Sequence, residues 1–85
     1  MDVLIDPHTL ARAEERGTNA EEIKDVIETG LMVAAKYGRA GKAKVYEFKQ
    51  SRLDRYYEQK RVEVFYVKDG ERIITVTLYV FYGSW

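Results

Sequence analysis

The sequence contains no cysteine, and it has a single histidine and a single proline among its 85 residues. The lack of cysteine excludes a disulfide scaffold, a cysteine-ligated zinc site and a thiol nucleophile, and it favours a reducing, cytoplasmic environment. No apolar run approaches the roughly 20 residues that a membrane span needs, so no membrane association is expected. No basic start followed by an apolar stretch indicates a signal peptide. The carboxylates have no cage-like spacing, so we expect no metal ion and no other cofactor.

The net charge is zero, but the charged residues are unevenly distributed along the chain. Residues 1–30 contain three basic and eight acidic residues, whereas residues 31–61 contain nine basic and three acidic ones. A basic segment of this kind can provide a local surface for anions or nucleic acid on a neutral protein. The alternative is a solvated basic hairpin without a ligand.

What the sequence does contain is enough apolar material, 46% of the chain, for one small domain over residues 1–85. The clearest element is a helix from Pro7 to Arg16. Asp6 is suited to cap its N-terminus, proline is favoured at the first helical position, and Gly17 can end it in a left-handed conformation. At 100° per residue, His8, Arg12, Glu15 and Arg16 share one face of this helix.

A second helix follows after a short turn. Asn19 with Glu22 forms one possible capping box, and Thr18 with Glu21 forms the alternative. Ile23, Val26 and Ile27 recur at helical spacing and are expected in the core, and Gly30 ends the helix.

The remainder predicts strands, at 31–37, 43–50, 61–67 and 72–82, with 3–5 either an edge strand or an anchor under the sheet. The stretch 51–59 is a polar loop or a strand extension. Asp69-Gly70 predicts a two-residue hairpin turn with both residues at positive φ. We therefore expect an α+β fold, in which an N-terminal helical hairpin packs on a three- to four-stranded antiparallel sheet. In the last strand, Thr75, Thr77 and Tyr79 are expected on the face opposite Ile74, Val76 and Leu78.

His8, Arg12 and Arg16-Gly17 follow one another at four-residue spacing, and they are followed by Glu21-Glu22-Ile23 and by the strands at 62–64 and 74–77. In their order and spacing these features resemble domain-of-unknown-function family 4258. It implies a RelE-like fold similar to that of the RelE/ParE toxins. It also implies a toxin component of a toxin–antitoxin pair, with metal-independent ribonuclease activity.

Metal-free RNA cleavage needs a base, cations that stabilise the phosphorane, and an acid. Histidine is the residue type that ordinarily titrates near neutral pH, so His8 is the candidate base. Arg12 and Arg16 could bind the phosphate, and Glu15 could orient His8 or act as the base itself. Tyr57, Tyr79 or Lys60 could supply the acid. The alternative is that these arginines only pair with nearby carboxylates.

The candidate RNA-binding residues combine cations, aromatic rings and hydroxyls, as in proteins that bind single strands. They are Arg52, Arg55, Tyr56, Tyr57, Lys60, Arg61, Thr75, Thr77 and Tyr79.

Two functions remain open at this stage. The first is a toxin-like RNA-binding protein or metal-independent endoribonuclease, with RNA or the ribosome as target and an antitoxin protein as partner. The second is a non-catalytic protein-interaction module, such as a degenerate toxin relative, a homodimer or one component of a complex. Trp85 could serve the second function by contacting a partner, or it could pack on the sheet.

Overall fold

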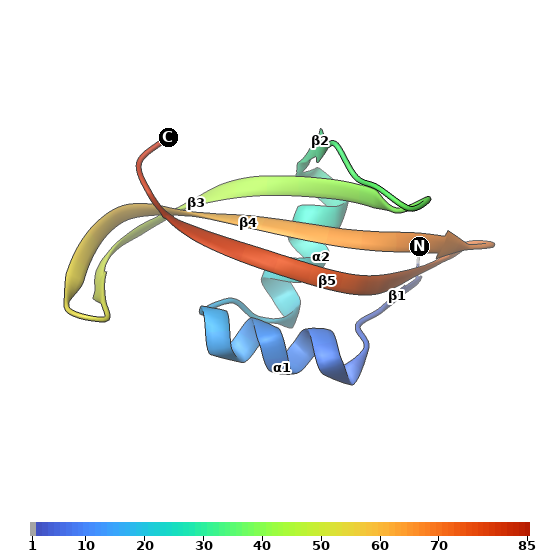
Figure 1. The fold of residues 1–85 in the computed structure, drawn as a ribbon, viewed down its shortest axis with the longest axis horizontal. Coiled ribbons are helices and arrows are strands. Elements are labelled where there is room, and N and C mark those ends of the chain that lie inside the picture. Colours follow the sequence, from blue (N-terminus) through green and yellow to red (C-terminus); the bar gives the residue numbers. More distant parts are fainter. Residues whose placement is uncertain (1) are drawn as a thin grey trace.

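The computed structural model describes residues 2–85, which form two helices and a five-stranded sheet (Figure 1). In chain order the elements are β1 (Asp2–Leu4), α1 (Pro7–Arg16), α2 (Ala20–Thr29), β2 (Leu31–Val33), β3 (Ala40–Arg52), β4 (Arg55–Asp69) and β5 (Arg72–Gly83). The strand order across the sheet is β1-β5-β4-β3-β2. β1 pairs in parallel with β5, and the other neighbours pair antiparallel.

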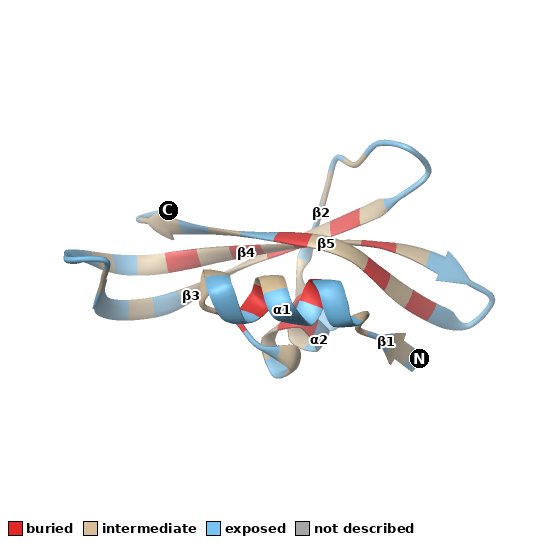
Figure 2. Ribbon diagram, turned by 60° about the horizontal axis from the view of Figure 1, so that its bottom comes forward, coloured by how far each residue is buried: buried red, intermediate tan, exposed pale blue. Residues whose placement is uncertain are grey.

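The expected fold, a helical hairpin on a three- to four-stranded antiparallel sheet of RelE type, is wrong. The sheet is mixed and has five strands within residues 2–85, because Asp2–Leu4 pairs with Arg72–Ile74 at the edge. The helices pack on the sheet separately: α1 lies on β5, whereas α2 lies on β3 and β4. Figure 2 shows both on the same side of the sheet. A three-residue strand such as β1 is stabilised mainly by pairing with its neighbour. The local sequence therefore predicted residues 3–5 only as either an edge strand or an anchor under the sheet.

The predicted limits of α1 are confirmed. The Asp6 side chain accepts hydrogen bonds from the backbone N–H groups of His8 (2.7 Å) and Thr9 (3.4 Å). Gly17 ends the helix at φ 90°, and its N–H donates to the Ala13 carbonyl at 2.9 Å. Neither helix in the described part of the chain is both long and apolar enough to cross a bilayer.

α2 begins as the Asn19 alternative predicts, since the Asn19 side chain accepts from the Glu22 N–H at 2.9 Å. Its predicted core residues are buried against the sheet. The apolar core consists of Ala13, Ile23, Val26, Ile27, Val62, Val64, Tyr66, Ile73 and Leu78. Gly30 ends α2 in an extended conformation, and a Cβ there would lie 2.4 Å from the Val26 carbonyl oxygen. Glycine is required at this position by the close packing of the backbone and not by a left-handed conformation.

The strand register fixes the turn residues of the two long hairpins, and the turn predicted at Asp69-Gly70 is displaced by one residue. Between β4 and β5 the turn residues are Gly70 and Glu71, because Asp69 pairs with Arg72, and only Gly70 has positive φ (65°). Between β3 and β4 the turn residues are Leu53 and Asp54, at φ 50° and 66°. Apart from these two turn residues, 51–59 belong to β3 and β4, as the strand-extension alternative predicts. The strand predicted at 31–37 pairs only over Leu31–Val33.

A β-bulge in β5 changes the predicted faces of that strand. Phe65 pairs with Thr77 and Tyr66 pairs with Thr75, which leaves Val76 as an extra residue. Thr75 therefore faces the helices and is 1% exposed. It accepts a hydrogen bond from the Asp6 N–H at 3.2 Å. The expectation that Thr75 shares a face with Thr77 and Tyr79 is wrong, because alternation alone cannot reveal an inserted residue.

Candidate functional site

The polar face of α1 is spread along the helix and does not converge. His8 is exposed. Its backbone N–H donates a hydrogen bond to Asp6, but its ring makes no hydrogen bond with any residue in the described range 2–85. Arg12 pairs with Glu15 at 3.8 Å on the surface. Eight positions separate His8 from Arg16, which corresponds to roughly 12 Å along the helix axis. These two side chains are therefore poorly placed to share one phosphate.

Arg16 leaves the α1 face and reaches the edge of the sheet. Its Nη1 donates to the Leu78 carbonyl, on the part of β5 that β1 leaves unpaired. Its guanidinium lies 5.4 Å from the centre of the Tyr79 ring. Arg16 thus bridges α1 to the sheet face opposite the helices.

Two predicted RNA-binding residues, Arg52 and Lys60, instead bind the C-terminal end of α1, together with Tyr82. Arg52 donates to the Glu15 carbonyl at 2.8 Å, Lys60 to the Gly17 carbonyl at 2.8 Å, and the Tyr82 hydroxyl to the Arg16 carbonyl at 2.6 Å. The last carbonyls of a helix lack partners within it and carry partial negative charge, so cations and donors stabilise them. Burial raises the pKa of Tyr82, which keeps its hydroxyl protonated as a donor.

Lys60 is also an ion-pair partner. Its Nζ lies 2.8 Å from the Glu22 carboxylate, and the residue as a whole is 8% exposed. The Thr18 hydroxyl donates to the same Glu22 oxygen at 2.8 Å. Lys60 is committed to joining α1, α2 and β4, and it presents no charge to a ligand.

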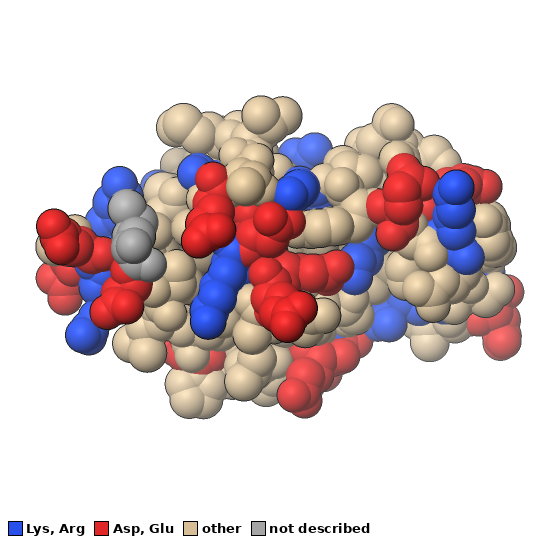
Figure 3. All heavy atoms as spheres, turned by 180° about the vertical axis from the view of Figure 1, so that it is seen from behind, with Lys and Arg blue, Asp and Glu red and all other residues tan. Residues whose placement is uncertain are grey.

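The other predicted residues of β4 lie apart from one another. Arg55 and Tyr56 are exposed near the β3–β4 turn, and Tyr57 packs on Tyr82 with ring centres 5.4 Å apart. Arg61 pairs with Glu63 at 3.0 Å. Seen from behind the view of Figure 1, acidic and basic side chains are interspersed without one continuous basic patch (Figure 3).

The sheet face opposite the helices carries a row of aromatic rings. Val62, Val64 and Leu78 point to the helices, so their odd-numbered neighbours point the other way. The ring centres of Phe65 and Tyr79 are 6.0 Å apart, and those of Tyr79 and Phe81 are 6.4 Å apart with an interplanar angle of 27°. Tyr79 is 45% exposed and Phe81 46% exposed. We call the face formed by Phe65, Thr77, Tyr79 and Phe81 the open face.

The loop at residues 34–39, between β2 and β3, borders the open face. Together they line a shallow, open cavity of about 190 Å³. Its lining comprises Ala34, Ala35, Lys36, Tyr37, Arg39, Phe65, Thr77 and Tyr79. The sequence predicts Thr77 and Tyr79 as site residues, whereas it does not single out Tyr37, Arg39 or Phe65. Alternation of Phe65 with Val64 and Tyr66 was an available signal for part of this set.

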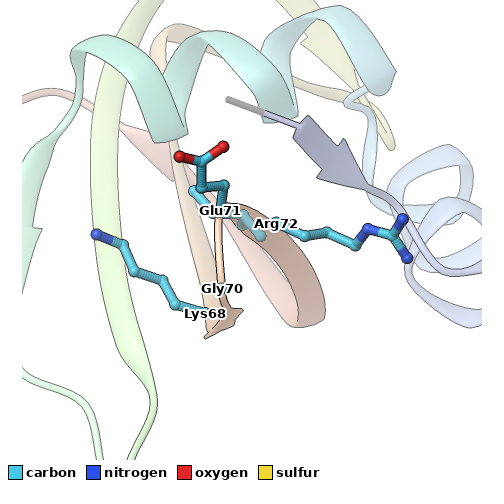
Figure 4. Close-up of a pocket in the computed structure, with 5 residues that line it drawn as sticks. Lys68, Gly70, Glu71 and Arg72 are labelled. Carbon is cyan, nitrogen blue, oxygen red and sulfur yellow. The ribbon is translucent and has the colours of Figure 1, made fainter.

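A larger hollow of about 360 Å³ lies at the β4–β5 turn. Figure 4 shows that Lys68, Glu71 and Arg72 extend from it in different directions. Charged groups that diverge cannot bind one ligand group together, so this hollow is a weaker candidate than the open face. No group of three His, Asp or Glu residues in the described chain is placed to hold a metal ion.

Comparison of the chain with protein-family models, with curated proteins and with solved structures found no match. The resemblance to family 4258 therefore stays a prediction, and the open face is the site with the most developed geometry.

Proposed function

We propose that the protein binds single-stranded RNA across the open face of its sheet. The observation that carries this proposal is the stacked, half-exposed pair Tyr79 and Phe81, with the Arg16 guanidinium over the Tyr79 ring. Exposed aromatic rings accept unpaired bases by stacking, and neighbouring cations neutralise the phosphates. The flanking Lys36 and Arg39 add positive charge at one end of the row.

The proposal is for RNA binding rather than RNA cleavage. Cleavage requires a base, an acid and cations around one phosphate. His8 and Arg16 lie roughly 12 Å apart along α1 by the helical rise, and Lys60 is engaged by Gly17 and Glu22. A toxin-like role, which the resemblance implies, would then act by occupying RNA. The absence of cysteine agrees with an RNA target in the cytoplasm.

Fluorescence anisotropy with a labelled 12-nucleotide single-stranded RNA tests this function. Base stacking on an aromatic side chain contributes about 1–3 kcal/mol, so Tyr79→Ala and Phe81→Ala should each weaken binding by roughly 5- to 150-fold. Leu10→Ala is the control, because Leu10 is a similarly exposed apolar side chain on α1, on the other side of the sheet from the open face. Gel analysis of the same samples should show intact RNA. Failure of the wild-type protein to bind RNA would end the proposal.

A second candidate function, protein interaction, is favoured by the edge strand β2. Leu31 is 79% exposed and Met32 is 85% exposed, on a three-residue strand whose outer edge has no partner strand within residues 2–85. Exposed apolar edge strands readily pair with another chain. Light scattering coupled to gel filtration tests this alternative. If the wild type is a dimer and Met32→Lys is a monomer, the protein-interaction function is supported. If the wild type is a monomer and binds no protein partner, that function is contradicted.

A further inference from the structure

The turn at residues 36–39 has a conformation that its sequence does not favour. The Arg39 N–H donates to the Lys36 carbonyl at 3.2 Å, with Tyr37 at φ 60° and Gly38 at φ 72° between them. A turn with both central residues at positive φ is best formed by Asn-Gly or Asp-Gly. Positive φ is rare for a bulky side chain and strains the backbone at a cost in free energy.

Packing does not compensate for that cost at Tyr37. Tyr37 is 86% exposed, and the Arg39 guanidinium lies 5.8 Å from the centre of its ring. A strained backbone that presents a solvated aromatic ring beside a cavity indicates a contact that is made only when a ligand is bound.

The cavity beside Tyr37 has the size and lining for one flat ring. Its volume of about 190 Å³ is below the roughly 300–1,000 Å³ of sites for drug-sized ligands. Phe65 and Tyr79 supply aromatic walls, and the Thr77 hydroxyl supplies a hydrogen-bonding group. Gly41 fixes one wall, since a Cβ at that position would lie 2.8 Å from the Phe65 ring.

We infer that this cavity takes a single unstacked nucleobase of the bound RNA. Tyr37 stacks on the base from the loop side, Thr77 contacts its polar edge, and Lys36 and Arg39 contact the adjoining phosphate. This inference rests on the proposed function, because it identifies one base-binding position at the end of the same open face.

Tyr37→Asn is the decisive variant, because asparagine is favoured at positive φ but lacks the ring. We expect Tyr37→Asn to unfold at a higher temperature than the wild type and to bind the 12-nucleotide RNA roughly 5- to 150-fold more weakly. Thr77→Val, which keeps the side-chain shape, should also weaken binding. Leu10→Ala on α1 should bind as the wild type does.

NMR titration with adenosine, cytidine, guanosine and uridine monophosphates tests the cavity apart from the polymer. We expect shifts of the Ala34, Ala35 and Thr77 signals with at least one of them, and their loss in Tyr37→Asn. If the wild type binds RNA but Tyr37→Asn and Thr77→Val bind it equally well, the base-binding inference fails and RNA binding stands. If no monophosphate shifts these signals, the inference also fails. If the wild type binds no RNA, both proposals fail.

Discussion

At the scale of single residues, the role of a cation depends on which partners surround it. Lys60 and Arg61 are adjacent on β4, and the sequence offers no reason to separate them. In the fold, Lys60 faces the helices and pairs with Glu22 at 2.8 Å, whereas Arg61 faces the opposite side and pairs with Glu63 at 3.0 Å. Of the two, only Arg61 lies on the side of the sheet where RNA binding is proposed.

Lys60→Met should therefore lower stability without a direct effect on RNA binding. The change removes the donor to the Gly17 carbonyl and leaves the partly buried Glu22 carboxylate without its cation. Loss of one partner of such a pair should reduce the free energy of unfolding by about 2–4 kcal/mol. Urea denaturation measures this, with the exposed Lys68→Met on the same strand as control. Equal stability of the two variants would show that Lys60 does not hold α1 and α2 to the sheet.

At the scale of elements, α2 is joined to β3 by a polar cluster. Asp25 accepts hydrogen bonds from Lys44 (2.7 Å) and from the Tyr46 hydroxyl (2.6 Å). The hydrogen bond from Lys44, followed by that from Tyr46, lowers the pKa of Asp25 below its usual 3.8. Burial, followed by the bond to Asp25, raises the pKa of Tyr46 well above its ordinary 10.0.

The pH dependence of stability follows from the direction of the Asp25 shift. A carboxyl whose pKa is lowered in the folded state stabilises that state above pH 3.8, and this stabilisation is lost as the pH falls through the folded-state pKa. Asp25→Asn should therefore lower stability at neutral pH and make it decline less steeply below pH 4. Thermal unfolding between pH 2 and pH 7 measures this, with Asp54→Asn at the exposed hairpin turn as control. A parallel decline in wild type and Asp25→Asn would contradict the assignment.

The elements also show what local sequence can and cannot predict. The sequence predicts both helices with their capping residues, because Asp6, Gly17 and Asn19 form hydrogen bonds with backbone groups only a few positions away in the chain. The pairing of Asp2–Leu4 with β5 and the bulge at Val76 depend on contacts with distant residues. The bulge decides the site, because it turns Thr75 toward the helices while Thr77 remains on the open face.

The candidate site follows the same division. The residue types alone indicate Tyr79, Thr77 and Arg16, but they predict Arg16 at a phosphate site with His8. Its contact with Tyr79 arises because the C-terminal end of α1 lies at the unpaired edge of β5. Tyr37 was missed because its positive φ is set by the turn between β2 and β3 and leaves no trace in the local sequence other than Gly38.

At the scale of the whole molecule, the net charge is zero. The salt dependence of RNA binding should therefore come from the few cations that lie beside the open face. For single strands the slope of log K against log[salt] is about −0.7 per phosphate contact, so contacts from Arg16, Lys36 and Arg39 predict a slope of about −2. Anisotropy titrations between 50 and 300 mM salt measure the slope. Arg39→Gln should make it shallower by about 0.7. A slope near zero, or a slope that Arg39→Gln leaves unchanged, would contradict phosphate binding beside the open face.

The proposed function requires that RNA contacts the open face and not the polar face of α1. NMR chemical-shift mapping with a 12-nucleotide single-stranded RNA distinguishes the two surfaces. We expect the largest shifts at Phe65, Thr77, Tyr79 and Phe81 and in the loop at 34–39, with little change around His8 and Arg12. Shifts centred on His8 and Arg12, with the open face unchanged, would contradict the proposed function.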